Sequence, residues 1–290
     1  MKRFLPMGFG WHPDVPDFRD FSPNHGAVRE LLHLIPDRRE SVNDPSCVDL
    51  RDYFLRDVPD QLGLNASSAY ASAALVEYFE YRTHGQIVNP SALFLYQTLQ
   101  RLAAAECTID CGLRATLKAM IRLGMPTEEY QERLEPTDPI LFSFAEFYRT
   151  IRYVRLDSRD GLNSDTLKVV KSFLHAGFPV AFGFAVPGSV SRDANIEYRP
   201  TFTSIQGGQA VVAAGYDDRR KINGTTGALL IRNSWGVDWG DKGYGWLPYA
   251  FVERRLALDF WTFLKPDWLE SGELSRPADI IGSTRNQPRS

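Results

Sequence analysis

The sequence is poor in the residues that build disulfide frameworks and metal centres. It has three cysteines and five histidines among 290 residues. Three cysteines are too few and too odd in number for a disulfide framework, and Cys107-x3-Cys111 has no second pair to complete a zinc site. One local disulfide bridge remains an alternative. We therefore expect no metal and no organic cofactor.

Long apolar runs are also missing. No stretch of 18 apolar residues occurs in the sequence, so no conventional membrane-spanning helix and no membrane partner are expected. The N-terminus MKRFLPMGFGWHPD carries two basic residues, but Pro6, Gly8 and Gly10 break its apolar stretch and no small-residue cleavage site follows. Secretion is not indicated, and the predicted location is the cytoplasm.

Neither sign of charge dominates. The 33 basic and 36 acidic residues are interleaved and leave a formal net charge of -3, so no basic stripe marks a nucleic-acid partner. With 43% hydrophobic residues, the chain can bury one large core or two lobes of ordinary domain size. The composition does not indicate an oligomeric state.

The first half of the chain is predicted to be an arm followed by a helical lobe. Residues 1–57 are rich in Pro, Asp and Arg, and we expect an extended arm that wraps the protein rather than forming a core. Residues 58–150 form the predicted helical lobe. Its central helix runs from Ser67 to His84, is small and apolar nearly all round at its start, and stops at Gly85. Two further helices are predicted over 91–105 and 113–123.

Residues 151–268 are predicted to form a β-rich lobe. An amphipathic helix follows Ser164 and ends at Gly177. Three apolar, partly β-branched runs then read as strands, at 179–186, 210–218 and 227–235, with Asn223-Gly224 as the turn between the last two. This order predicts a two-lobed α+β protein with its cleft between the lobes. Residues 269–290 are polar and predicted to be disordered.

Three segments of the chain then line up with one known family. They are DQLGLNASSAYASA from residue 60, GGQA from residue 207, and NSWGVDWGDKGYGW from residue 233. Over residues 10–265 the chain resembles the papain-like cysteine peptidases, and GWHPDVPDFRD and ECTIDCGLRATLKAM resemble segments of their bacterial members. The resemblance implies a helical left lobe and an antiparallel, β-barrel-like right lobe with the cleft between them.

The resemblance assigns roles to four polar residues. Ser67 stands where the family has its nucleophilic Cys, at a helix N-terminus that favours a thiolate. Gln209 stands where the family has the His that serves as general base. Asn233 matches the Asn that orients this His, and Gln61 matches the side chain that shares the oxyanion hole with the nucleophile's backbone N–H.

Further positions are implied on the substrate side of the cleft. Gly112 resembles the glycine whose backbone pairs with an extended substrate, and Ala210 lines the cleft near the second substrate residue. Trp235 resembles the Trp that shields the Asn–His hydrogen bond. The family's disulfide near the nucleophile lacks a partner, because Leu64 stands where a Cys belongs.

These replacements predict a silent site. A Ser hydroxyl is essentially un-ionised at pH 7 and needs an adjacent base, whereas a Gln amide cannot accept a proton near neutral pH. None of the histidines occupies a matching position: they are His12, His25, His33, His84 and His175. Loss of one member of a serine-protease triad costs on the order of 10⁶-fold in turnover. We therefore expect a homologue that binds an extended peptide or protein in its cleft without cutting it.

Other interpretations stay open at this point. Ser67 could be an ordinary helix N-cap, Gln209 a solvent-facing strand residue, Asn233 and Trp235 core or turn residues, and Gly112 a simple turn glycine. The chain could be an inactivated form of an active cysteine endopeptidase, with Cys replaced by Ser and His by Gln. It could also be a serine-dependent hydrolase, although serine-bearing relatives such as the silicateins keep their His.

Overall fold

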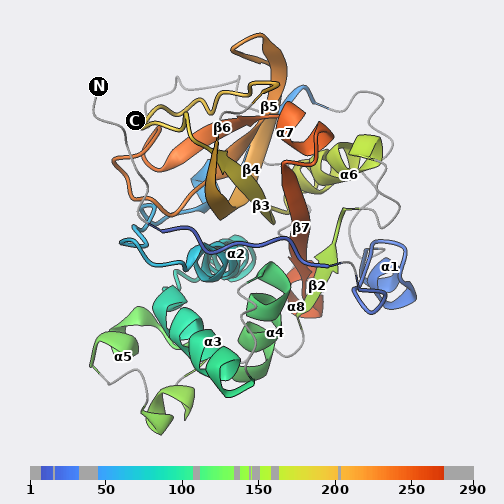
Figure 1. Cartoon of the computed structure of the whole chain (residues 1–290). Helices are drawn as coiled ribbons and strands as arrows, with labels where there is room; N and C mark the ends of the chain where they lie inside the picture. The colour runs from blue at the N-terminus through green and yellow to red at the C-terminus, as the bar shows by residue number, and fades with distance from the viewer. Residues whose placement is uncertain are drawn as a thin grey trace, which may run out of the picture.

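The computed structural model describes residues 8–15, 17–32, 45–106, 112–133, 138–143, 145, 151–157, 163–201 and 204–270. They form an α+β protein in which a helical lobe and an antiparallel sheet meet on one central helix (Figure 1). This confirms the predicted fold class. The cysteine pair Cys107 and Cys111 and residues 271–290 of the predicted disordered tail lie outside the described residues, whereas Leu269 and Glu270 end a short helix and so do not belong to a disordered tail.

The helical lobe is built around α2, Ser67–His84. This helix is buried along most of its length because its first two turns consist of Ala and Ser apart from Tyr70, and these small residues let neighbouring elements approach closely. It ends at Gly85, whose φ of 66° is the left-handed conformation that closes many helices. The helices α3 (Ala92–Glu106) and α4 (Leu113–Leu123) pack on one side of it, and β4 packs on the other.

The second lobe is a twisted antiparallel sheet. Its strand order is β2-β7-β3-β4-β5-β6, and β1 pairs with the far end of β4. The strands are β1 Cys47–Asp49, β2 Arg152–Arg155, β3 Val180–Pro187, β4 Ile205–Ile222, β5 Thr225–Arg232, β6 Tyr244–Pro248 and β7 Ala257–Leu264. The helix α6, Asn163–His175, packs on β3 and β4. The remaining short helices are α1 Gly26–Leu32, η2 Arg51–Tyr53, α5 Glu128–Arg133, η3 Pro139–Ser143, α7 Ala250–Glu253 and α8 Pro266–Glu270.

The long helices and the central strands lie where the sequence predicts them. The turn at Asn223-Gly224 is also confirmed, because both residues have positive φ, 43° and 82°, as a tight hairpin turn requires. The strands β1, β2, β6 and β7 were not predicted. β1 and β2 are too short to show a period, β6 overlaps the glycine-rich motif, and β7 is buried on both faces, so its apolar residues do not alternate with exposed polar ones.

The N-terminal arm differs from its prediction. Its segment 8–15 runs in front of α2, between the sheet and the helical lobe, and leads toward α1 (Figure 1). The arm does not only wrap the protein, because Trp11, Val28 and Leu50 are 4%, 0% and 0% exposed and belong to the hydrophobic core. Apolar residues scattered at irregular spacing give no periodic signal, so this burial was not visible in the sequence.

Candidate functional site

Backbone pairing between two loops brings the candidate residues together. The N–H of Gln61 donates to the Ser234 carbonyl at 2.9 Å, and the N–H of Gly236 donates to the Pro59 carbonyl at 3.1 Å. The loop that precedes α2 is thereby fastened to the loop that follows β5. Gln61 and Asn233, 172 positions apart in the chain, face one site for this reason.

The Gln209 side chain lies at the centre of a polar network. It extends from β4, is completely buried, and its Nε2 lies 3.0 Å from Gln61 Oε1, 2.9 Å from Asn233 Oδ1 and 3.2 Å from Ser234 Oγ. The Ser234 hydroxyl donates to Gln61 Oε1 at 2.6 Å. Because Gln209 is buried, the interpretation of a solvent-facing strand residue is wrong. Ser234 lies inside the motif NSWG, but nothing in the sequence indicates its hydrogen bond to Gln61.

Ser67 begins α2, with Ala66 at the N-cap position. Its side chain is completely buried, and its Oγ accepts the N–H of Ala210 at 3.0 Å. Among the described residues no His or carboxylate forms a hydrogen bond with this hydroxyl. The N-cap interpretation is therefore wrong, and the hydroxyl has no general base beside it.

Two hydrogen-bond donors converge next to Ser67. The backbone N–H of Ser67 and the Nε2 of Gln61 both donate to the carbonyl oxygen of Phe9, at 3.1 Å and 2.9 Å. These are the two donors that the resemblance assigns to an oxyanion hole. The structure places a carbonyl of the chain's own arm between them.

The arm is hydrogen-bonded on both sides of this carbonyl. Phe9 N–H donates to Asn65 Oδ1 at 3.0 Å, and Ser68 Oγ donates to the Gly10 carbonyl at 2.8 Å. Trp11 N–H donates to the carbonyl of Gly208, the residue before Gln209, at 3.1 Å. The expected open cleft is therefore filled at its centre, which explains why the side chains at the nucleophile and base positions have no exposure.

A buried charged cluster fastens the next part of the arm. Asp259, in β7, accepts the Trp11 indole N–H at 3.1 Å and the Asp14 backbone N–H at 2.7 Å, while Arg155 donates to its other oxygen at 2.6 Å. Burial raises the pKa of Asp259 to about 7, against the opposing effects of the Asp14 N–H and Arg155. Arg114, at the start of α4, binds Asp20 at 2.6 Å and so holds the arm to the helical lobe.

Two of the three remaining predicted positions, Ala210 and Trp235, lie next to this centre. Ala210 is buried, and its backbone contacts Ser67 as described above. Trp235 is 6% exposed and packs edge-to-face on Trp239 with ring centroids 5.3 Å apart. Gly112 is the N-cap residue of α4, and its carbonyl accepts the N–H and hydroxyl of Thr116. The structure brings Ala210 and Trp235 next to the polar network and places Gly112 at the start of α4.

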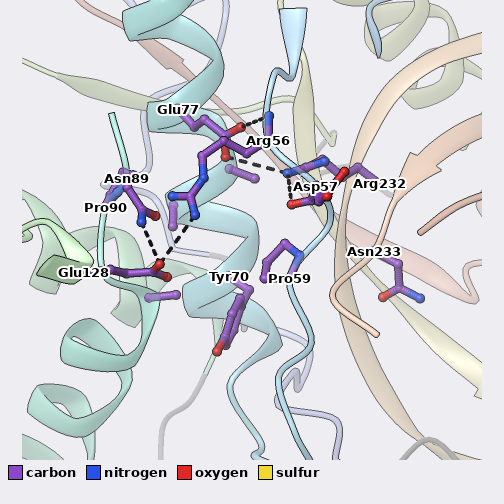
Figure 2. Close-up of a pocket in the computed structure, with 13 residues that line it drawn as sticks. Arg56, Asp57, Pro59, Tyr70, Glu77, Asn89, Pro90, Glu128, Arg232 and Asn233 are labelled. Carbon is purple, nitrogen blue, oxygen red and sulfur yellow. Dashed lines mark hydrogen bonds and ion pairs between the residues drawn. The ribbon is translucent and has the colours of Figure 1, made fainter. Parts of the chain in front are cut away.

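A small polar cavity beside α2 adjoins the site, and Asn233 lines it (Figure 2). Its volume of about 40 Å³ is room for about three water molecules, so it is too small for a peptide. Among its lining residues, Arg56 and Asn89 both bind Glu128, at 3.6 Å and 2.7 Å, and Arg232 lies 3.6 Å from Glu77. Burial raises the pKa of Glu77, and the nearby Arg232 opposes this rise.

Neither a metal site nor a membrane span is found in the part of the chain that the structure describes. No group of three or more His, Cys, Asp or Glu side chains there could hold a metal ion. No helix among the described residues is long and apolar enough to cross a bilayer.

Comparisons with known proteins agree with this architecture. Residues 45–251 match the family described as papain family cysteine protease. A peptidase C1-like protein of Acanthamoeba polyphaga mimivirus is 29% identical over 89% of this chain and 86% of its own length.

Solved structures show the same fold. Xylellain, a cysteine protease from Xylella fastidiosa, superposes with a TM-score of 0.67 at 27% identity, over 91% of this chain and 98% of its own. A procathepsin B of Trypanosoma congolense superposes with a TM-score of 0.61 at 18% identity, over 90% of this chain and 86% of its own. The family match spans more than half of the sequence and includes the segments around Ser67, Gln209 and Asn233. The chain belongs to the papain family of cysteine proteases.

Proposed function

We propose that this chain is a catalytically silent papain-family homologue that holds an extended peptide in its cleft without cleaving it. The observation that carries the proposal is the hydrogen bonding of Gln209. The side chain at the general-base position is an amide whose Nε2 lies within hydrogen-bonding distance of Gln61, Asn233 and Ser234, and an amide cannot take the proton of Ser67 near neutral pH.

The chemistry of the site supports the silent half of the proposal. A cysteine peptidase needs a thiolate and an imidazolium, and neither Ser67 nor Gln209 can form its part of that pair. A hydroxyl without a base keeps its proton at neutral pH. The oxyanion hole and substrate binding alone leave only about 10³- to 10⁴-fold acceleration over water.

The hydrogen bonds of the arm support the binding half. The donors Ser67 N–H and Gln61 Nε2 both lie within hydrogen-bonding distance of a peptide carbonyl, here that of Phe9. Strand β4 supplies a further backbone acceptor at Gly208. A polypeptide in extended conformation satisfies all three groups at once, because its carbonyl and N–H groups alternate along the chain.

The test restores the reacting pair. Ser67→Cys, Gln209→His and the double variant are compared with the unchanged chain on a mixed fluorogenic peptide library, each also in a Trp11→Ala background to loosen the arm. We expect cleavage only from the double variant, because the thiolate needs its imidazolium partner. Cleavage by the Gln209→His variant alone would show that Ser67 is a competent nucleophile. It would contradict the proposal that two losses silence the site.

A further inference from the structure

The described segment Gly8–Trp11 fits the cleft through its glycines as well as through its backbone hydrogen bonds. Gly8 and Gly10 have φ angles of 120° and 118°, which L side chains rarely adopt. A Cβ on Gly8 would lie 2.4 Å from the Leu64 carbonyl oxygen, and one on Gly10 would lie 2.3 Å from the Asn65 carbonyl oxygen. Both glycines face the backbone that leads into α2, so no other residue fits at either position.

On the sheet side of the segment, strands β3 and β4 carry glycines where Phe9 and Trp11 approach them. A Cβ on Gly183 in β3 would lie 1.9 Å from the Trp11 indole, and one on Gly207 in β4 would lie 2.7 Å from the Phe9 ring. Gly208 approaches the Trp11 carbonyl in the same way, with its Cβ position 2.3 Å from that oxygen. Glycine inside a strand weakens the strand, and its presence there marks a close approach of another group. The body of the protein is therefore shaped to receive two aromatic side chains of the arm.

From this two-sided fit we infer that the peptide for which the cleft is selective has the pattern glycine–aromatic–glycine–tryptophan, and that the chain supplies this peptide itself. The inference rests on the proposed function, because it names the ligand of the same cleft. Recognition has three parts: the Phe9 carbonyl between its two donors, the glycines that pass the Leu64–Ala66 backbone, and the Trp11 indole in the Gly183 socket with its N–H on Asp259.

The pattern makes the cleft a narrow receptor. A peptide with a side chain at the Gly8 or Gly10 position meets main-chain atoms, which cannot move aside as a flexible side chain can. A tethered segment is also present at an effective concentration of about millimolar order, so it outcompetes most free peptides. A foreign peptide enters only when it reproduces the pattern and the resident segment is weakened.

The experiment uses the full chain with single alanine substitutions. Gly10→Ala damages the resident segment and leaves the cleft intact, whereas Gly183→Ala fills the socket and leaves the arm intact. Gly26→Ala is the matched control, because Gly26 lies in α1 of the same arm and a Cβ there meets nothing within 4 Å. Amide hydrogen exchange of residues 8–15 reports arm docking, and exchange in α2 and β4 reports that each variant is folded.

A labelled peptide with the sequence of residues 8–15, GFGWHPDV, then tests recognition in trans by fluorescence anisotropy. We expect it to bind the Gly10→Ala chain at least about tenfold more tightly than it binds the unchanged chain. An alanine at position 10 is strained at the positive φ of this residue and clashes with the Asn65 carbonyl, so the resident segment leaves the cleft more readily. It should bind the Gly10→Ala/Gly183→Ala chain no better than a scrambled octapeptide does. Gly8→Ala serves as a second opening variant in case Gly10→Ala does not fold.

Two results would overturn the inference. One is that residues 8–15 stay equally protected in the Gly10→Ala, Gly183→Ala and Gly26→Ala chains. The other is that the scrambled octapeptide binds as well as GFGWHPDV. If library peptides bind the cleft while GFGWHPDV does not, the inference fails and the proposed function stands. If GFGWHPDV binds selectively and is hydrolysed, the proposed function fails and the inference stands.

Discussion

Replacing Arg155 by Met removes the cation that links three buried carboxylates. Arg155 donates to Asp157 at 3.0 Å and to Asp259 at 2.6 Å, and lies 3.5 Å from Asp20. The exposed fractions of the four side chains are between 1% and 11%. The methionine fills much of the same volume and makes no hydrogen bond, so Asp259 and Asp157 lose the arginine that pairs with them, whereas Asp20 keeps Arg114.

The structure indicates a large loss of stability. Removing one partner of a buried ion pair costs about 3–5 kcal/mol, because an uncompensated charge remains. At about 2.1 cal/mol/K per residue, a chain of 290 residues has an unfolding entropy of about 0.6 kcal/mol/K. Dividing the first figure by the second predicts a melting temperature about 5–8 °C lower at neutral pH.

The loss depends on pH in a defined direction. Arg155 lowers the pKa of Asp259, so its removal lets burial raise that pKa further above the value in the unfolded chain. A group with a raised folded pKa stabilises the protein below its unfolded pKa and loses this contribution as pH rises through the folded pKa. The deficit of Arg155→Met should therefore shrink between pH 8 and pH 5.

Calorimetry at pH 5 and pH 8 measures both effects. The matched control is Arg19→Met, which removes an arginine that binds Asp17 at 2.6 Å but is itself 73% exposed. We expect the melting temperature of this control to stay within experimental error, because solvent screens the exposed pair. Equal shifts in the two variants, or a deficit for Arg155→Met that grows toward pH 5, would refute the reasoning.

Three further predictions concern single side chains. Asp259→Asn should reduce the fall in the free energy of unfolding between pH 5 and pH 8, because the raised pKa of Asp259, about 7, produces part of that fall. The free energy is measured by urea unfolding at each pH, and the same fall in the variant and the unchanged chain would contradict this. Ser234→Ala should cost about 1–3 kcal/mol in urea unfolding, since its hydroxyl donates to the buried Gln61 Oε1 at 2.6 Å, whereas a neutral effect would show that the network is dispensable. Tyr78→Phe should cost about 1 kcal/mol in the same assay, because it removes a buried 2.8 Å hydrogen bond to the Gly177 carbonyl, and no loss would mean that this bond makes no net contribution.

Local pattern was enough to predict the central elements, whereas the candidate site residues follow from the resemblance of three segments to one family. The helix α2 follows from its composition and from its stop at Gly85, and the hairpin between β4 and β5 follows from Asn223-Gly224. The six-residue interval between Gln61 and Ser67 places the two donors side by side, because one residue precedes α2 and the other begins it. These features depend on residues close together in the chain.

The contacts of the arm could not be predicted, because they join residues far apart in the chain. The Phe9 carbonyl meets a side chain 52 positions away, and the Trp11 indole meets a carboxylate 248 positions away. In the sequence, Gly8 and Gly10 are visible only as breaks in an apolar stretch. Their positive φ angles and their close approach to the backbone before α2 appear only when both partners are in place. The role of Ser234 could not be predicted for a related reason, because its hydroxyl donates to Gln61, 173 positions away in the chain.

The central claim is that Ser67 has no base, and hydrolysis by the unchanged chain compared with Ser67→Ala tests it most directly. Both proteins are incubated at equal concentration with the fluorogenic library and with GFGWHPDV. The hydrolysis products are measured by mass spectrometry, with a detection limit low enough to register the spontaneous hydrolysis of the peptides. We expect the two proteins to be indistinguishable, because the hydroxyl that the variant lacks does no chemistry. Hydrolysis by the unchanged chain that is lost in Ser67→Ala would contradict the account, and would mean that a base reaches this serine.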